Sequence, residues 1–288
     1  MIDLNEHNIS EEVIRRWDGC PDARFRQIMA QLIRHLHDFA RDVKLTEAEW
    51  MAGIKFLTAV GHKCDDLRQE FILLSDTLGL SQLVVAQNHS RPPAATEQTV
   101  FGPFWVEGAP RLPHGADIAN GASGDPCHFT IAVRDLEGRP VPDATVDVWH
   151  ADASGGYDVQ DPAWSMASAK MRAVFQSDAA GALRFWSVLP ACYPVPTDGP
   201  VGDMLRASHR HPMRPGHLHV MVHKPGFDTL ITHVYVKGDP YLDSDAVFGV
   251  RQSCIGDYVR HERGRAPDGR VMDRPFYTLD TTVSLAPA

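Results

Sequence analysis

Residues 214–222 read Arg214-Pro215-Gly216-His217-Leu218-His219-Val220-Met221-Val222. In an extended strand, successive side chains point to opposite faces, so His217 and His219 share one face while Leu218 takes the other. Two imidazoles on one strand face can occupy neighbouring positions around a metal ion. A His-x-His pair in a β-rich chain is more often surface decoration or polar packing, so other residues must decide between metal binding and structure.

Four further stretches alternate in the same way, and turn signals such as Lys237-Gly238-Asp239-Pro240 follow them. These stretches are residues 127–133, 144–149, 182–188 and 230–236. Repeated short strands with this spacing predict an antiparallel β-sandwich in the C-terminal two thirds of the chain.

The first hundred residues have a helical pattern instead. Between Asp22 and Val43 apolar residues recur every three or four positions, which predicts one amphipathic helix. Thr46-Glu47-Ala48-Glu49 is a capping box that opens a second helix. Residues 67–85 are apolar almost all round and predict a third helix, before Arg91-Pro92-Pro93 breaks helical structure. We therefore predict an α+β protein, with a helical N-terminal domain over residues 1–100 and an antiparallel β-sandwich catalytic domain over residues 101–288.

Composition and charge exclude several classes of protein. The 288 residues include 28 basic and 37 acidic side chains, and the net charge of −9 argues against nucleic acid as a partner. The first thirty residues hold no apolar signal region, and no apolar run approaches the roughly 18 residues of a membrane helix. The five cysteines are odd in number, scattered and without a C-x-x-C, which predicts reduced thiols and a cytoplasmic protein.

Two tyrosines add to the histidine pair. Tyr157 follows two glycines in Ser154-Gly155-Gly156-Tyr157, and Tyr193 opens Tyr193-Pro194-Val195-Pro196. Both lie at turns beside strand-like runs, where a phenol can point inward without disturbing a strand ladder. Two tyrosinates and two histidines suit a ferric ion, because the phenolate is hard and anionic and imidazole is a good ligand for iron.

Taken together and in order, these segments resemble the intradiol ring-cleaving dioxygenases of the catechol 1,2-dioxygenase type. The likeness runs from about Arg68 to about Tyr277, and the ordered set Tyr, Tyr, Arg, His-x-His is far more specific than any one member. The segments that carry it are Thr99-Val100-Phe101-Gly102-Pro103-Phe104, Asp147-Val148-Trp149-His150-Ala151-Asp152, Gly156-Tyr157, the run from Tyr193 to Gly202, and Arg214-Pro215-Gly216-His217-Leu218-His219.

The resemblance implies non-haem Fe(III) as the cofactor, with an aromatic diol or triol and O2 as substrates. It implies that Tyr157 and His217 stay on the iron through turnover, while Tyr193, opposite His219, leaves when substrate arrives. Arg214 would stabilise negative charge on the ring, as a fixed guanidinium can without reorganising. It further implies a homodimer through the N-terminal helices, with a phospholipid bound between them.

Within this family the hydroxyquinol-cleaving enzymes look most similar. The supporting features are the segments at Tyr193 and Tyr241, and His233, where catechol enzymes tend to carry glutamine. Asp76 interrupts an apolar run and would face a third ring hydroxyl, although it could equally belong to a polar helix face with Ser75 and Thr77. Catechol remains the alternative substrate. The predicted substrate contacts are Leu73, Asp76, Val100, Phe101, Gly102, Pro103, Phe104, Pro194, Val195, Pro196, Arg214, His233 and Val247.

Two rivals come from other classes. His150-Ala151-Asp152 has the spacing of an Fe(II) facial triad, which leaves both tyrosines unexplained. A prealbumin-like binding module would fit the turn-rich strands, such as Pro140-Val141-Pro142-Asp143-Ala144, but needs neither the tyrosine–histidine set nor the helical third. Colour separates the three, since only ferric tyrosinate makes a concentrated solution red.

Overall fold

The computed structural model describes residues 3–65, 68–89 and 92–288. The chain divides into two compact units, one up to residue 59 and one from residue 60 onward. Leu67, the first residue of the third predicted helix, and Arg91, in the predicted helix-breaking segment, lie outside the described residues.

The first unit is helical. It holds α1 (Ile9–Arg15), α2 (Ala23–Asp42) and most of α3 (Glu47–His62). Asp22 caps α2 by accepting a 2.9 Å hydrogen bond from the Phe25 amide. Six apolar residues spaced three or four positions apart along α2 and its C-cap stay about half exposed, whereas Ile33 is buried; the six are Phe25, Ile28, Leu32, Leu36, Phe39 and Val43.

The predicted capping box before α3 is present. The Thr46 amide donates to Glu49 Oε2 at 2.9 Å, and the Glu49 amide donates to Thr46 Oγ1 at 3.3 Å. Each side chain thus satisfies a backbone N–H that the helix itself leaves unpaired.

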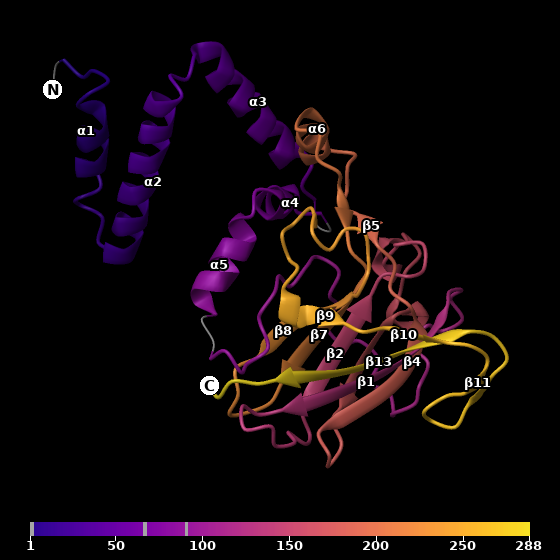
Figure 1. Ribbon diagram of the computed structural model, residues 1–288. Helices are drawn as coiled ribbons and strands as arrows, with labels where there is room; N and C mark the ends of the chain where they lie inside the picture. Colours follow the sequence, from indigo (N-terminus) through magenta and orange to yellow (C-terminus); the bar gives the residue numbers. More distant parts are fainter. Residues whose placement is uncertain (1–2, 66–67, 90–91) are drawn as a thin grey trace. The chain divides into compact units, whose positions relative to one another are not determined.

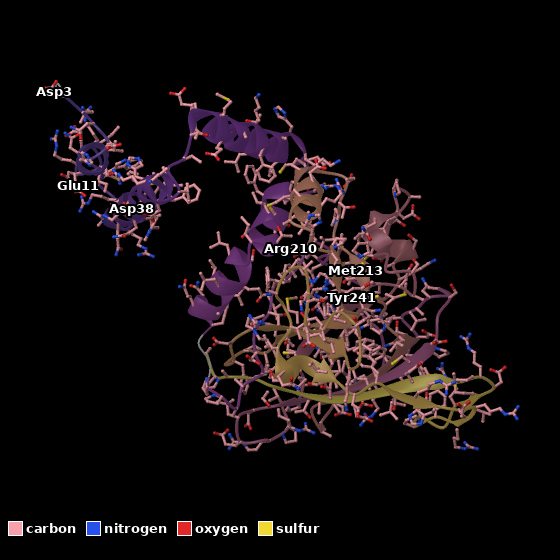
Figure 2. All side chains as sticks on the ribbon, turned by 45° about the horizontal axis from the view of Figure 1, so that its top comes forward. Asp3, Glu11, Asp38, Arg210, Met213 and Tyr241 are labelled. Carbon is pink, nitrogen blue, oxygen red and sulfur yellow. The ribbon has the colours of Figure 1, made fainter. Side chains whose placement is uncertain are left out.

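The second unit adds three helices to a β-sandwich. They are α4 (Glu70–Thr77), α5 (Leu80–Asn88) and α6 (Pro200–Ala207). Gly79 separates α4 from α5 with φ of 77°, a conformation that glycine adopts without strain. Figure 2 shows the side chains of the chain and labels Arg210 and Met213, which lie in the segment that leads from α6 into the sandwich.

The sandwich consists of a four-stranded and a five-stranded sheet. The first has the order β10-β13-β1-β4, from β10 (Val259–His261), β13 (Phe276–Ser284), β1 (Pro126–Arg134) and β4 (Ala182–Val188). The second has the order β3-β2-β7-β8-β9, from β3 (Arg172–Gln176), β2 (Thr145–His150), β7 (His217–His223), β8 (Leu230–Val236) and β9 (Ile255–Gly256). Figure 1 shows β1 beside β13 in the first of these layers.

Shorter elements lie in the segments between these strands. Two small ladders pair β5 (Tyr193–Pro194) with β6 (Met213–Arg214), and β11 (Gly264–Arg265) with β12 (Val271–Met272). The 3-10 helices are η1 (Asp158–Gln160), η2 (Met166–Ser168) and η3 (Gln252–Cys254). The predicted α+β class, with helices first and a sandwich after them, is confirmed. Most strand pairs are antiparallel, while β1–β13 and β8–β9 run parallel.

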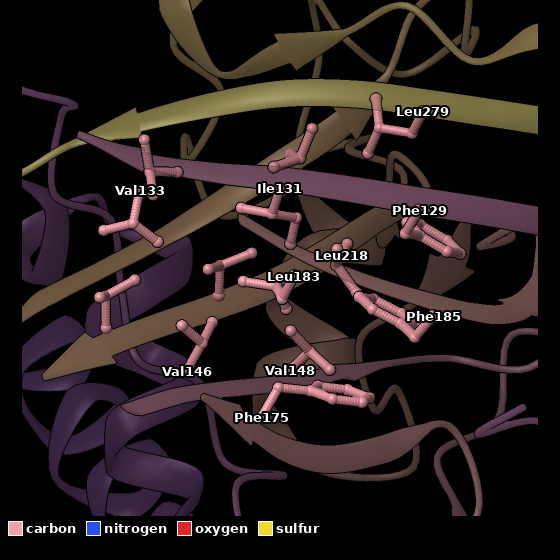
Figure 3. Packing of buried hydrophobic residues seen from close by; sticks show 14 of the residues in the cluster. Phe129, Ile131, Val133, Val146, Val148, Phe175, Leu183, Phe185, Leu218 and Leu279 are labelled. Atoms are coloured by element: carbon pink, nitrogen blue, oxygen red, sulfur yellow. The ribbon is translucent and has the colours of Figure 1, made fainter. Parts of the chain in front are cut away.

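Aliphatic side chains and three phenylalanine rings fill the space between the sheets, as Figure 3 shows. Phe185 stacks on Phe129 at 4.8 Å and on Phe175 at 5.0 Å between ring centroids. Each such pair adds about 0.5–1.5 kcal/mol beyond the burial of its area. Leu218 and Val220 of β7 reach the same core, so strand alternation sends their neighbours His217 and His219 to the outer face of the five-stranded sheet.

Candidate metal centre and substrate cavity

His217 and His219 form the centre of the site. Both rings are 1% exposed, and their Nε2 atoms are 3.2 Å apart. His217 Nδ1 lies 2.7 Å from the carbonyl oxygen of Pro215, which requires a proton on Nδ1 and leaves a lone pair on Nε2. His219 Nδ1 lies 2.9 Å from His233 Nε2. The other ring nitrogen of His219, Nε2, is the one that faces His217 Nε2.

Tyr157 reaches the histidines from the loop that follows β2. Its backbone amide donates to Gln160 Oε1 at 2.7 Å at the start of η1, and its ring stacks on Phe104 at 4.3 Å. These contacts hold the phenol oxygen 3.0 Å from His219 Nε2. The two glycines before Tyr157 allow the turn, and Gly155 has φ of 87°.

Tyr193 completes the group through the β5–β6 ladder, in which it pairs with Arg214. Its hydroxyl lies 3.4 Å from that of Tyr157. Four polar atoms from Tyr157, Tyr193, His217 and His219 are therefore linked by separations of 3.0–3.4 Å. Ligands that share one ion at bond lengths of about 2 Å lie this far from one another, so the donor set fits a metal ion.

Burial controls the protonation of these groups. It lowers the pKa of His217 to about 3, with the positive charge of Arg214 acting in the same direction. Burial also puts the pKa of His219 well below its ordinary value, so both imidazoles are neutral and ready to bind a cation at neutral pH. Burial, and then the neighbouring Tyr193, raise the pKa of Tyr157 well above its ordinary value. A bound cation would reverse that shift by stabilising the phenolate.

His233 lies within reach of the same point but has no free nitrogen. Among the described His, Cys, Asp and Glu side chains, His217, His219 and His233 form a group close enough to share an ion. His233 Nδ1, however, lies 2.7 Å from the Tyr235 hydroxyl, and its Nε2 is the partner of His219. The two tyrosines complete the donor set better than this third imidazole.

Arg214 is buried beside the donor group. Its Nε donates to Asp245 Oδ1 at 3.1 Å, its Nη1 to the Tyr193 hydroxyl at 3.3 Å and its Nη2 to the Tyr235 hydroxyl at 3.3 Å. Burial acts to raise the pKa of Asp245, but the Arg214 guanidinium, the Gly249 amide and His217 together outweigh it and lower that pKa. Arg214 thus presents a fixed positive charge next to Tyr193.

A cavity of about 230 Å³ opens beside Tyr193 and Arg214. It unites most of the predicted substrate contacts: Leu73, Asp76, Val100, Gly102, Pro103, Phe104, Val195, Pro196, Arg214 and Val247. Three predicted contacts lie elsewhere. Phe101 packs against Trp105 and Trp149, Pro194 is exposed, and His233 lies behind His219.

Five residues that line the cavity were not among the predicted substrate contacts: Arg68, Gln69, Glu70, Ile72 and Gln160. Glu70 is fully buried, where it pairs with Arg68 at 2.8 Å and accepts from the Val201 amide at 3.2 Å. The sequence does place the oppositely charged Arg68 and Glu70 at the start of an apolar helix, and this pattern could have predicted the ion pair. Gln160 had no signal in its own sequence neighbourhood.

The facial-triad alternative does not fit the structure. His150 Nε2 lies 2.7 Å from Ser187 Oγ, and its Nδ1 lies 2.7 Å from the Ala151 carbonyl oxygen. Asp152 accepts hydrogen bonds from Ser154 and Gly156 within its own turn. Strand β2 ends at His150, and the turn that follows engages Asp152 with its own backbone, so the two side chains do not converge on an ion.

Comparison with known proteins bears on the class of this chain. Residues 22–96 match the family model described as the catechol dioxygenase N terminus, and residues 100–276 match the dioxygenase model. The chain belongs to the intradiol ring-cleavage dioxygenases, an enzyme family of oxidoreductases. This confirms the family predicted from the sequence. The family depends on a metal and acts on an aromatic diol with O2.

Within the family, the similarity extends over nearly the whole chain. The 6-chlorohydroxyquinol 1,2-dioxygenase of Cupriavidus pinatubonensis is 56% identical over 264 residues, 92% of this chain and 95% of that protein. The hydroxyquinol 1,2-dioxygenase of Nocardioides simplex is 49% identical over 284 residues, 98% of this chain and 96% of that protein. The solved structure of a hydroxyquinol 1,2-dioxygenase from Pseudomonas putida aligns with a TM-score of 0.92 at 45% identity, covering 98% of this chain and 99% of that one.

In the part of the chain that the structure describes, every helix is too short or too polar to cross a bilayer.

Proposed function

We propose that this protein is a hydroxyquinol 1,2-dioxygenase. It would use Fe(III) and O2 to cleave 1,2,4-trihydroxybenzene between the carbons that carry hydroxyls 1 and 2. The product would be 3-hydroxy-cis,cis-muconate, which tautomerises to maleylacetate, in the breakdown of aromatic compounds. The observation that carries this proposal is the Asp76 carboxylate in the wall of an otherwise largely apolar cavity beside Arg214.

The iron would be held by Tyr157, Tyr193, His217 and His219. Support comes from the separations of 3.0–3.4 Å among their donor atoms and from the neutral state of both imidazoles. Two hard phenolates and two nitrogens favour a ferric ion over softer or redox-inactive metals. Bound there, the ion would act as a Lewis acid that acidifies phenols and draws electron density from the ring.

The protein's own groups would manage protons and charge. A diol that binds through both oxygens must release two protons, and the Tyr193 oxygen is a well-placed acceptor for one of them. Arg214 Nη1 donates to that oxygen at 3.3 Å, so the guanidinium also stands where negative charge develops on the ring. Because Asp245 fixes Arg214, this charge needs no reorganisation during the reaction.

Asp76 would provide the preference for a third hydroxyl. Burial raises its pKa, while a hydrogen bond from Ser81 and the charge of Arg214 oppose that rise. A ring hydroxyl would donate a further hydrogen bond to this acceptor in its desolvated cavity, and a plain catechol would not. Sites built around a substrate hydroxyl discriminate strongly against an analogue that lacks it.

Steady-state kinetics with both substrates test this preference. We expect kcat/KM for hydroxyquinol to exceed that for catechol by about 10²-fold or more, because catechol has no hydroxyl to donate to the Asp76 carboxylate. Asp76→Leu should narrow the ratio by harming hydroxyquinol more than catechol. Asp76→Asn keeps the shape and one acceptor oxygen, so it should retain part of the preference. Equal or better kcat/KM for catechol in the wild type would make this a catechol 1,2-dioxygenase that yields cis,cis-muconate.

We further propose that residues 1–100 form a dimerisation domain and residues 101–288 the catalytic domain. The half-exposed apolar face of α2 supports a homodimer, because a row of large apolar side chains is rarely left to solvent. The dimer would enclose a phospholipid between its helices, which solvent extraction and mass spectrometry would detect. The scattered cysteines, all of them free, support a place in the cytoplasm.

Light scattering measures the predicted assembly directly. We expect twice the chain mass of 31.9 kDa for the wild type. Leu36→Lys places a charge on the exposed apolar face and should shift the protein toward monomer. Gln27→Lys adds the same charge to the opposite face of α2 and should leave the dimer intact. A wild-type monomer at micromolar concentration would rule the dimer out.

A further inference from the structure

Tyr235 is a buried phenol that the proposed reaction leaves without a role. It is fully buried and does not line the substrate cavity. In the β7–β8 ladder Tyr235 pairs with His217, and His233 pairs with His219. Both β8 side chains therefore lie on the outer face of the sheet, next to the two imidazoles of the proposed iron site.

The hydrogen bonds around Tyr235 have a fixed direction if His219 binds an ion through Nε2. His219 then carries its proton on Nδ1 and donates it to His233 Nε2 at 2.9 Å. His233 must in turn carry its proton on Nδ1 and donate it to the Tyr235 oxygen at 2.7 Å. Neutral imidazole has one donor and one acceptor, so in these tautomers the Tyr235 oxygen is the acceptor at the end of the chain of hydrogen bonds.

A second donor reaches the same oxygen from the other side. Arg214 Nη2 donates to Tyr235 at 3.3 Å, while Arg214 Nη1 donates to Tyr193 at 3.3 Å. One phenol oxygen thus joins the His219 side of the proposed iron site to the guanidinium beside Tyr193. The connected groups are His219, His233, Tyr235, Arg214 and Tyr193.

The backbone closes tightly over this junction. A Cβ atom added at Gly249 would lie 2.7 Å from the Tyr235 oxygen, 3.0 Å from Asp245 Oδ2 and 3.1 Å from Arg214 Nη2. The Gly249 amide donates to Asp245 Oδ2 at 2.8 Å. The Gly249 backbone therefore packs closely against the Tyr235 oxygen and its partners Arg214 and Asp245.

We propose that Tyr235 is a positioning residue of this dioxygenase, whose oxygen fixes the orientation of His219 through His233 and the orientation of Arg214 directly. The inference rests on the proposed iron site. Outer partners of metal ligands typically change metal affinity or activity by about 10- to 100-fold when they are removed. Tyr235 differs from an outer partner of a single ligand, because its oxygen contacts both His233, which holds His219, and Arg214.

Tyr235→Phe tests the role, because it removes the oxygen and keeps the ring. We expect iron to remain bound, the visible absorption band to shift, and kcat to fall by about 10- to 100-fold with a smaller change in KM. Gly249→Ala crowds the same oxygen without removing it and should shift the band in the iron-loaded protein as well. Iron per chain, the visible spectrum, steady-state kinetics and the melting temperature are measured on each variant.

Tyr258→Phe is the matched control. Tyr258 is also buried, and its hydroxyl donates at 3.0 Å to the carbonyl oxygen of Val234, which lies on β8 next to Tyr235. Unlike Tyr235, Tyr258 packs in the core between the sheets. The Tyr258→Phe variant should have a lower melting temperature than the wild type, with its visible absorption band and kcat unchanged. If Tyr235→Phe behaves like this control, Tyr235 is structural and the inference is wrong. If the wild type itself shows no iron and no visible band, the proposed iron site fails, and the positioning role falls with it.

Discussion

Tyr157→Phe is expected to abolish the visible absorption band or shift it strongly, and to remove most of the activity. The Tyr157 oxygen lies 3.0 Å from His219 Nε2 and 3.4 Å from the Tyr193 oxygen. Its loss would therefore remove the donor atom that lies between Tyr193 and His219 in the proposed iron site. Losing a ligand should cost more than the roughly 10- to 100-fold typical of outer partners. The visible spectrum, the iron content and kcat measure the effect.

The change at Tyr157 needs a comparison that separates ligand loss from packing. Tyr277→Phe makes the same chemical change on β13, in the other sheet, and should leave colour and kcat as in the wild type. The double change His217→Ala and His219→Ala should leave a colourless protein without iron. If iron content and colour survive that double change, the metal lies elsewhere.

Arg214→Lys is expected to keep iron and colour but to lower kcat by about 10²- to 10³-fold, the scale seen when one fixed charge-stabilising donor is lost. Arg214 spans Asp245, Tyr193 and Tyr235 at 3.1–3.3 Å with three different nitrogens. A lysine ammonium keeps the charge but, as a single point donor, cannot hold all three acceptors in one plane.

Arg210→Lys is the control for this change. Arg210, which Figure 2 labels, donates to the backbone carbonyls of Thr77 and Ala246 and makes neither of these bonds to the donor group. It should alter stability and leave kcat nearly unchanged. A near-normal turnover number for Arg214→Lys, with the melting temperature lowered in both variants, would reduce Arg214 to a structural residue.

The sequence by itself determined the local features. Period-two alternation placed Leu218 and Val220 in the core and the two histidines on the opposite face, because neighbouring side chains on a strand must diverge. The capping box at Thr46 likewise depends on backbone groups only three residues apart. The family could be predicted because its motif residues stand in a fixed order along the chain.

Only the tertiary structure decided which distant groups meet. Asp245 holds Arg214 although the two residues are 31 positions apart in the sequence, and Tyr157 contacts His219 although they are 62 positions apart. Glu70 enters the cavity wall because α4 packs near α6, and β13 joins β1 in parallel at the far end of the chain. Local dihedral preferences and hydrophobic periodicity act over a few residues. Contacts between distant segments depend on how all the layers pack together, and no short stretch of sequence contains that information.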